Sequence, residues 1–164
     1  MTSMATYFGT KVVMARQMTR QAYNDYRGWK LPENENGSDL GFLVEYVDGG
    51  APNDPRHAGY ISWSPRDVFE RAYRPTTGLT FGEALEALKI GKCVAREGWN
   101  AAGQFVYLVP AGAYPAQTGA AKRAFGEGAL IPYRAYLALK TAQGDIATWA
   151  PSGSDALADD WRIV

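Results

Sequence analysis

The stretch Leu79–Lys92, LTFGEALEALKIGK, decides the fold of the second half of the chain. Thr80 and Glu83 have the spacing of a capping box, in which each side chain satisfies a backbone N–H of the other residue. Apolar residues then recur at the spacing of one helix face, at Phe81, Ala84, Leu85 and Leu88. Gly91 stands where helices commonly end at a glycine. The stretch therefore predicts a helix that starts after Thr80, ends at Gly91 and faces a core with one side.

Short apolar or alternating runs downstream of this helix predict antiparallel strands. These runs are Cys93–Arg96, Phe105–Val109, Tyr133–Thr141, Ile146–Trp149 and Trp161–Val164. The turn Ala142–Asp145 makes a hairpin of the third and fourth runs. Short helices are expected at Gln117–Phe125 and at Ser154–Asp159, where Ser154 would be the N-cap. We therefore predict that one helix packs on an antiparallel sheet in the second half.

The first half is predicted to be a small α+β module, and the segment Arg74–Gly78 separates it from the second half because Pro and Gly end both neighbours. Its expected strands are Thr10–Ala15, Phe42–Val47 and Gly59–Trp63. One helix should run from Thr19 to about Tyr26 and end at Gly28; another should span Arg66–Tyr73, with Ser64 as N-cap and Pro65 in the first helical position. The fold class is thus α+β, with domains at residues 1–75 and 76–164.

Composition and charge exclude several classes of function. The chain has 17 basic and 17 acidic residues, balanced in both halves, so no basic stripe for nucleic acid is visible. No apolar run approaches the roughly 20 residues that a membrane-spanning helix needs. With one cysteine and one histidine, neither a disulfide nor a zinc site of the usual ligands is expected. We expect a soluble protein of the cytoplasm without metal, cofactor, nucleic acid or membrane as a partner.

Signatures of catalysis are missing from the sequence. It contains no P-loop, no G-x-S-x-G and no H-E-x-x-H. His57 lies in a polar loop, with Asp54 as a weak candidate for an orienting partner. Cys93 is expected to be an inert buried thiol. Asp159 and Asp160 are adjacent, so in a strand their side chains would point to opposite faces and could not share a proton. We therefore expect no enzymatic activity and no catalytic residue.

The run Arg96-Glu97-Gly98-Trp99-Asn100 indicates ligand binding. Trp99 and Asn100 leave a strand together at a Gly-bounded turn, which places a flat stacking surface beside an amide with donors and an acceptor. Arg96 could meet a phosphate through two nitrogens. The alternative is that Trp99 fills the core and Asn100 forms a turn. In the next strand Phe105 and Tyr107 share one face and Val106 takes the other, and one of these faces must be core.

Several segments of the second half closely resemble the second Thoeris anti-defence family of phage proteins. They are LTFGEALEALKIGK at Leu79–Lys92, VAREGWN at Val94–Asn100, QFVYLVP at Gln104–Pro110, YPA at Tyr114–Ala116, YLALK at Tyr136–Lys140, WAPS at Trp149–Ser152 and DALADDWRIV at Asp155–Val164. Cys93 departs from the family, where a valine or isoleucine would be ordinary. The first half resembles a module found in phage proteins, with no function attached to it.

This resemblance implies a phage counter-defence protein that sequesters, without degrading it, the cyclic ADP-ribose-type signal of a bacterial TIR-domain defence enzyme. Members form tetramers with ligand pockets at subunit contacts, and some hold cyclic dinucleotides from the related CBASS pathway. A protein of this kind would act in the cytoplasm of the infected bacterial host. The ligand would be glycocyclic ADP-ribose or a cyclic dinucleotide, held as an intact molecule, and the sequence leaves the choice between them open. The alternative from another class is a phage structural or protein-interaction adaptor with no small-molecule ligand, and a third is a nucleotide hydrolase.

The candidate ligand-binding residues follow from the turn and from the resemblance together. Trp99 would stack on a base or cover a ribose, and Asn100 would hydrogen-bond ring or sugar groups. Phosphate would be met by Arg96 or Arg134, and ribose hydroxyls by Asp159 or Asp160. Tyr107 and Trp149 are further candidates.

Overall fold

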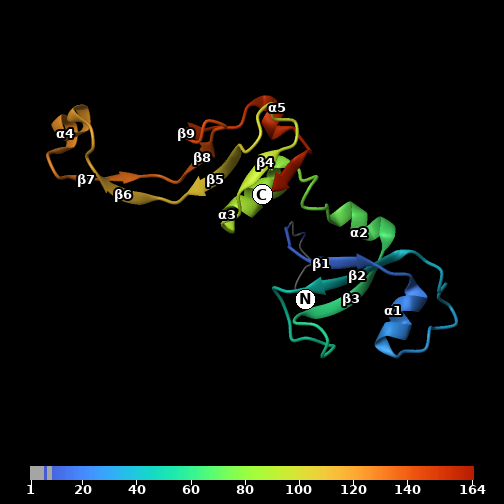
Figure 1. Cartoon of the computed structure of the whole chain (residues 1–164). Helices are drawn as coiled ribbons and strands as arrows, with labels where there is room; N and C mark the ends of the chain where they lie inside the picture. The colour runs from blue at the N-terminus through green and yellow to red at the C-terminus, as the bar shows by residue number, and fades with distance from the viewer. Residues whose placement is uncertain (1–5, 7–8) are drawn as a thin grey trace. The chain divides into compact units, whose positions relative to one another are not determined.

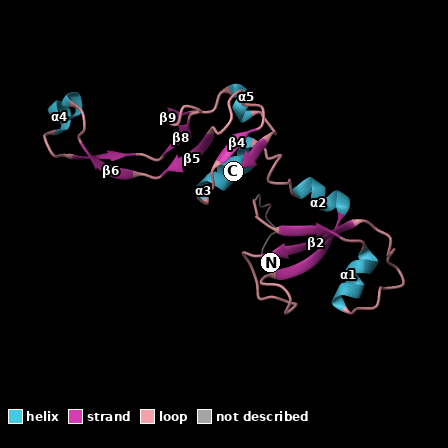
Figure 2. Cartoon of the chain, viewed as in Figure 1, coloured by secondary structure: helices cyan, strands magenta, loops and turns pink. Residues whose placement is uncertain are grey.

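The computed structural model describes residue 6 and residues 9–164 (Figure 1). The chain forms two compact units, Met1–Arg74 and Pro75–Val164, here called unit 1 and unit 2. Both contain helices and antiparallel strands (Figure 2), so the predicted α+β class is confirmed.

Unit 1 is built on a three-stranded antiparallel sheet in the order β1 (Met14–Gln17), β2 (Gly41–Tyr46), β3 (Tyr60–Pro65). Helix α1 (Arg20–Arg27) is capped as predicted: the Thr19 side chain accepts a hydrogen bond from the backbone N–H of Ala22, and Gly28 ends the helix with φ of 70°. Tyr23 of α1 packs against Leu43 and Ile61 on one face of the sheet. On α2 (Arg66–Ala72), Phe69 stacks on Phe42 of β2 at 4.1 Å between ring centroids.

Two boundaries in unit 1 differ from the sequence prediction. The first strand begins at Met14 rather than Thr10, because Met14 pairs with Glu45 near the end of β2 and earlier residues would run past that end. Ser64 does not cap α2, because it lies within β3 opposite Phe42, and the N-cap is Pro65, which has no capping side chain.

Unit 2 contains a five-stranded antiparallel sheet in the order β10-β4-β5-β8-β9 (Figure 1). Its strands are Trp161–Ile163 (β10), Val94–Arg96 (β4), Phe105–Val109 (β5), Tyr136–Lys140 (β8) and Ile146–Trp149 (β9). Helix α3 (Phe81–Lys89) packs against β10, β4 and β5. The capping box of Thr80 and Glu83 is present, and Gly91 follows the helix end with φ of 82°.

The core of unit 2 lies between α3 and one face of the sheet. Its buried members come from both elements and from the segment before the helix: Leu79, Ala84, Ala87, Leu88, Val94, Val106 and Trp161. Val106 is therefore the core side of β5. Just outside the helix, Leu79 exchanges two backbone hydrogen bonds with Trp161, from Leu79 N at 2.7 Å and from Trp161 N at 3.1 Å. The two ends of this unit are thus joined directly.

A second, two-stranded sheet was absent from the sequence prediction. It consists of β6 (Gly112–Pro115) and β7 (Leu130–Tyr133), with α4 (Gly119–Phe125) between them, and it extends from the ends of β5 and β8 (Figure 1). Pro115 and Pro132 lie within these strands, and proline lacks the N–H that a central strand uses. The sequence pattern of β6 and β7 therefore does not predict strands. Tyr133 belongs to β7, and β8 starts later, at Tyr136.

The last helix, α5 (Gly153–Ala156), is also shifted from the prediction. It is capped by Ser152 rather than by Ser154. The reason is that Asp155 stands three residues after Ser152, and the two close a capping box in which each side chain bonds the backbone of the other. Ser154 lies within the first turn and has no such partner at the third position.

Candidate functional site

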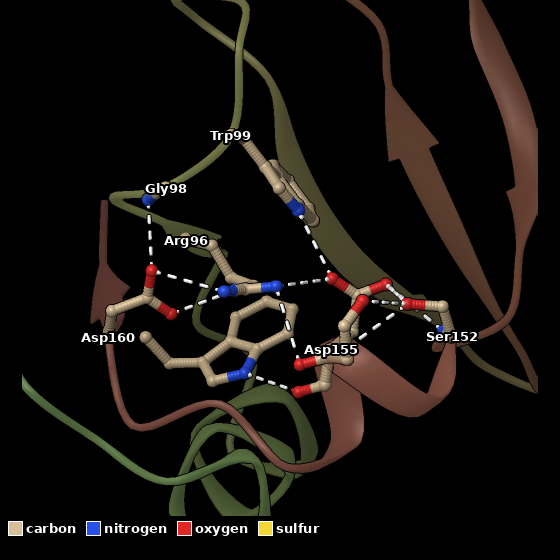
Figure 3. A network of polar contacts seen from close by, with 8 residues as sticks. Arg96, Gly98, Trp99, Ser152, Asp155 and Asp160 are labelled. Carbon is tan, nitrogen blue, oxygen red and sulfur yellow. Dashed lines mark hydrogen bonds and ion pairs between the residues drawn. The ribbon is translucent and has the colours of Figure 1, made fainter.

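The end of β4 and the segment before β10 are joined by an ion-pair network centred on Arg96 (Figure 3). The guanidinium donates to Asp160 from Nε at 2.7 Å and from Nη2 at 3.3 Å. Its Nη1 donates to Asp155 at 3.0 Å. Two carboxylates therefore compensate the one cation, and the hydrogen bond from Arg96 holds the pKa of Asp160 below its ordinary value. This arrangement ties the end of β4 to α5 and to the segment before β10 through Arg96.

Asp155 connects this ion pair to the aromatic side chains. Its carboxylate accepts hydrogen bonds from Trp99 Nε1 at 3.3 Å and from the Ser152 hydroxyl at 2.6 Å, and its backbone carbonyl accepts one from Trp161 Nε1 at 3.0 Å. Burial raises the pKa of Asp155, but hydrogen bonds from Ser152 and Arg96 outweigh it and lower the pKa to about 2. The side chain is 13% exposed. Asp155 is thus an ionised, shielded acceptor that fixes the indole of Trp99.

Gly98 sets the path of the loop that follows β4. Its backbone N–H donates to Asp160 at 2.9 Å (Figure 3). A Cβ at this position would lie 2.9 Å from the same Asp160 oxygen, closer than side-chain carbons normally approach. The glycine therefore allows the backbone to reach the carboxylate, and Trp99 leaves the loop from a position tied to the ion pair.

Trp99 packs against the core and also lines a hollow. Its ring contacts Trp161 at 5.5 Å and Trp149 at 6.2 Å between centroids, both edge to face. It also lines an open hollow of 350 Å³ together with Asn100, Ala101, Gln104, Leu139 and Trp149. Among the described residues, the amides of Asn100 and Gln104 have no hydrogen-bond partner. The hollow thus offers aromatic walls and solvent-accessible amide groups that can hydrogen-bond a ligand.

The structure brings together only some of the residues predicted for the site. Trp99, Asn100 and Trp149 line one hollow, and Arg96 with Asp160 lies behind it. Tyr107 alternates with the core residue Val106 and therefore lies on the other face of the sheet.

Arg134 and Asp159 are both exposed and lie outside the hollow, Arg134 between β7 and β8 and Asp159 before β10. Sequence analysis missed Gln104 and Asp155. The Ser152-x-x-Asp155 spacing was the available signal for Asp155.

In unit 1, His57 has partners other than the one suggested by the sequence. Its Nδ1 lies 2.7 Å from Glu45 and its Nε2 lies 2.8 Å from the hydroxyl of Tyr26. Asp54 is instead bound to Arg56, whose guanidinium donates to both carboxylate oxygens. Glu45 also accepts the backbone N–H groups of residues 58 and 59, so this cluster fastens the loop before β3 to the sheet.

Among the residues that the structure describes, no group of three or more His, Cys, Asp or Glu side chains is arranged to hold a metal ion. No helix in residue 6 and residues 9–164 is long and apolar enough to cross a membrane.

The geometry defines unit 2 as a small α+β domain, with one helix on an antiparallel sheet and an aromatic hollow beside the β4–β5 loop. The model of the Thoeris anti-defense 2-like domain matches residues 79–164, just over half of the chain, and the chain belongs to this family. Thoeris anti-defense 2 of Bacillus phage SP01 is 41% identical over 91 residues, covering 54% of this chain and 97% of that protein. The resemblance carried by the sequence motifs is confirmed, and membership supports a phage counter-defence role against Thoeris.

Proposed function

We propose that this chain binds a cyclic nucleotide immune signal, glycocyclic ADP-ribose first and cyclic dinucleotides next, and sequesters it unchanged in the host cytoplasm. The observation that carries the proposal is the hollow at the β4–β5 loop, where two indoles stand beside the free amides of Asn100 and Gln104. A nucleobase needs a flat apolar surface and a ribose needs hydrogen-bond partners, and this set of side chains supplies both.

Preorganisation supports tight binding at this hollow. A protein that acts by sequestration depends on affinity, and affinity rises when the binding groups are already held in place. Trp99 is held by its hydrogen bond to Asp155, which is itself bonded to Arg96 and Ser152. We propose that Arg96, Asp155 and Asp160 position the loop rather than contact the ligand.

The pyrophosphate of such a ligand would need a cation that the hollow does not contain. The lining residues are aromatic, amide or aliphatic, and Arg96 is compensated by carboxylates. We propose that a second copy of the chain completes the site in a homo-oligomer, a tetramer as the family resemblance implies. Arg134, which is exposed outside the hollow, is the candidate for this contact.

We propose binding rather than turnover because of the side chains that line the hollow. Trp, Asn, Gln, Ala and Leu do not include a nucleophile paired with a general base. Asp155 is the nearest carboxylate bonded to a lining residue, and its oxygens are occupied by Arg96, Trp99 and Ser152. Its lowered pKa makes it a poor proton acceptor at neutral pH.

The test is thermal unfolding of the full chain with glycocyclic ADP-ribose, cyclic dinucleotides or NAD, followed by chromatography of the recovered ligand. A sequestering protein should gain about 2.7 kcal/mol of stability at a hundred times the dissociation constant and return the ligand intact. No stabilisation by any of these molecules would favour the protein-interaction adaptor. Stabilisation with an altered ligand would mean that the protein is an enzyme.

A further inference from the structure

The five-stranded sheet has a second face that α3 does not cover. Core contacts are made by Val94, Val106, Leu137, Leu139, Trp149 and Ile163. Because side chains alternate along a strand, the residues between them point to the opposite side, here called the outer face. Its strand positions are Ala95, Phe105, Tyr107, Val109, Tyr136, Ala138, Lys140, Ile146, Thr148 and Arg162.

Aromatic rings and small residues share the middle of the outer face. The rings of Phe105 and Tyr107 lie 6.3 Å apart between centroids, and Tyr136 pairs across with the end of the same strand and is 40% exposed. Ala138 lies directly opposite Tyr107 in the register. Ala138 is fully buried, so neighbouring side chains cover this position, and an open hollow of 450 Å³ adjoins Phe105 and Tyr107. The rings of Phe105 and Tyr107 are half-buried and tilted by 55° to one another, so each offers a separate aromatic surface beside this hollow.

Cations surround these rings without compensating carboxylates. Lys140 donates from Nζ to the carbonyl of Gly103 at 3.1 Å and lies 5.9 Å from the centre of the Phe105 ring. Arg162 occupies the far edge strand, opposite Ala95. Lys92 lines the hollow. None of these three cations has an ion pair among the described residues, and none of the outer-face strand positions is Asp or Glu.

The charge pattern indicates what covers this face. If two copies met face to face about a two-fold axis, Lys140 and Arg162 would approach the same cations of the partner with no acidic strand position between them, and like charges disfavour such contacts. An anionic ligand with flat groups has the opposite preference. Bases stack on exposed rings of a sheet, and phosphates pair with the cations around them.

We propose that the outer face of unit 2 binds single-stranded nucleic acid. The balanced charge of the whole chain had indicated no nucleic-acid partner, but that balance is not uniform. Asp155 and Asp160 form ion pairs with Arg96 at the β4 end, whereas the cations of the outer face have no ion pair among the described residues. The inference does not depend on the proposed cyclic nucleotide site, which lies beside the β4–β5 loop.

The test is fluorescence anisotropy of the full chain with labelled oligo-dT and oligo-rU of about 12 nucleotides, at about 50 to 200 mM salt. The wild-type protein should bind and weaken as salt rises. The double variant Lys140→Gln/Arg162→Gln should bind roughly tenfold more weakly. The slope of the logarithm of its association constant against the logarithm of the salt concentration should be shallower by about 1.4, because each lost phosphate contact contributes about 0.7 to this slope. Tyr107→Ala should weaken binding with little change in this slope.

Matched controls lie on the α4 arm. Arg123→Gln removes a cation there, and Phe125→Ala removes a ring that is 63% exposed, so both should bind as the wild type does. Absence of oligonucleotide binding at low salt overturns the proposal. An affinity that the outer-face substitutions leave unchanged overturns it too. Analytical sedimentation tests whether a second copy of the chain covers the outer face instead. If the outer-face variants change the oligomeric state and leave oligonucleotide binding unchanged, the outer face is an interface between copies of the chain. Retained stabilisation by glycocyclic ADP-ribose in these variants would show that the other site is intact.

Discussion

Replacement of Asp155 by asparagine should destabilise the protein in a pH-dependent way. Asp155 has an ordinary pKa of 3.8 and a folded pKa of about 2. This difference corresponds to about 2.5 kcal/mol at neutral pH, because each tenfold change in proton affinity is about 1.4 kcal/mol. Solvent screens part of the interaction with Arg96, so we expect a loss of about 1–2 kcal/mol in the free energy of unfolding at pH 7.

The sign of the pH dependence follows from the lowered pKa. The ionised carboxylate stabilises the folded state fully above the unfolded pKa, and this contribution is lost as the pH falls from about 4 towards 2. At about pH 3 the wild-type advantage over Asp155→Asn should be about half of its value at pH 7. Urea unfolding at both pH values measures this difference in the free energy of unfolding. Tryptophan fluorescence can follow it, because Trp99, Trp149 and Trp161 are in mutual contact in the folded state.

A neighbouring carboxylate provides the control for this prediction. Asp159 is exposed and lies in the same segment before β10, outside the network, so Asp159→Asn should stay within about 0.5 kcal/mol of the wild type at both pH values. If Asp155→Asn were as stable as the wild type at pH 7, the network would not stabilise the fold. A loss of equal size at pH 7 and pH 3 would show that the ionised form of Asp155 is not the origin of the effect.

Two further substitutions test the loop between β4 and β5. Trp99→Ala should weaken binding of the cyclic nucleotide by roughly 1–3 kcal/mol in calorimetry, while Tyr107→Ala, on the other face of the sheet, should bind as before; equal effects would contradict the assignment of the hollow. Gly98→Ala should cost about 1–3 kcal/mol in urea unfolding, because the new Cβ meets Asp160. Gly153→Ala, where a Cβ meets nothing within 4 Å, is its control, and similar losses in both would rule out a steric role for Gly98.

The parts of the fold that could be predicted from sequence are those set by local pattern. The capping box at Thr80 and the alternation of β5 depend on residues a few positions apart, and both are present. The β6–β7 sheet could not be predicted, because Pro115 and Pro132 are tolerated only where the neighbouring chain does not need their missing N–H, and that is a property of the pairing.

The site shows the same division between local and distant determinants. Trp99 and Asn100 were predicted to act together because they are adjacent, and they line one hollow. Arg96 was predicted as a candidate for phosphate from its own chemistry, whereas its partners in the fold, Asp155 and Asp160, stand 59 and 64 residues away in the sequence. The ion pairs of Arg96 could therefore not be predicted, because the sequence pattern gives no measure of how closely distant residues approach.

The two backbone hydrogen bonds between Leu79 and Trp161 hold the first and last segments of unit 2 side by side. A chain enters and leaves such a unit at one point, so a foreign segment can be spliced in front of it without stretching any strand. It also makes unit 2 a candidate for circular permutation, because Ile163 donates a backbone hydrogen bond to the carbonyl of Thr76 at 3.0 Å. A short linker from Val164 to Thr76, with new termini opened in the α4 arm, would preserve the five-stranded sheet and the Trp99 hollow.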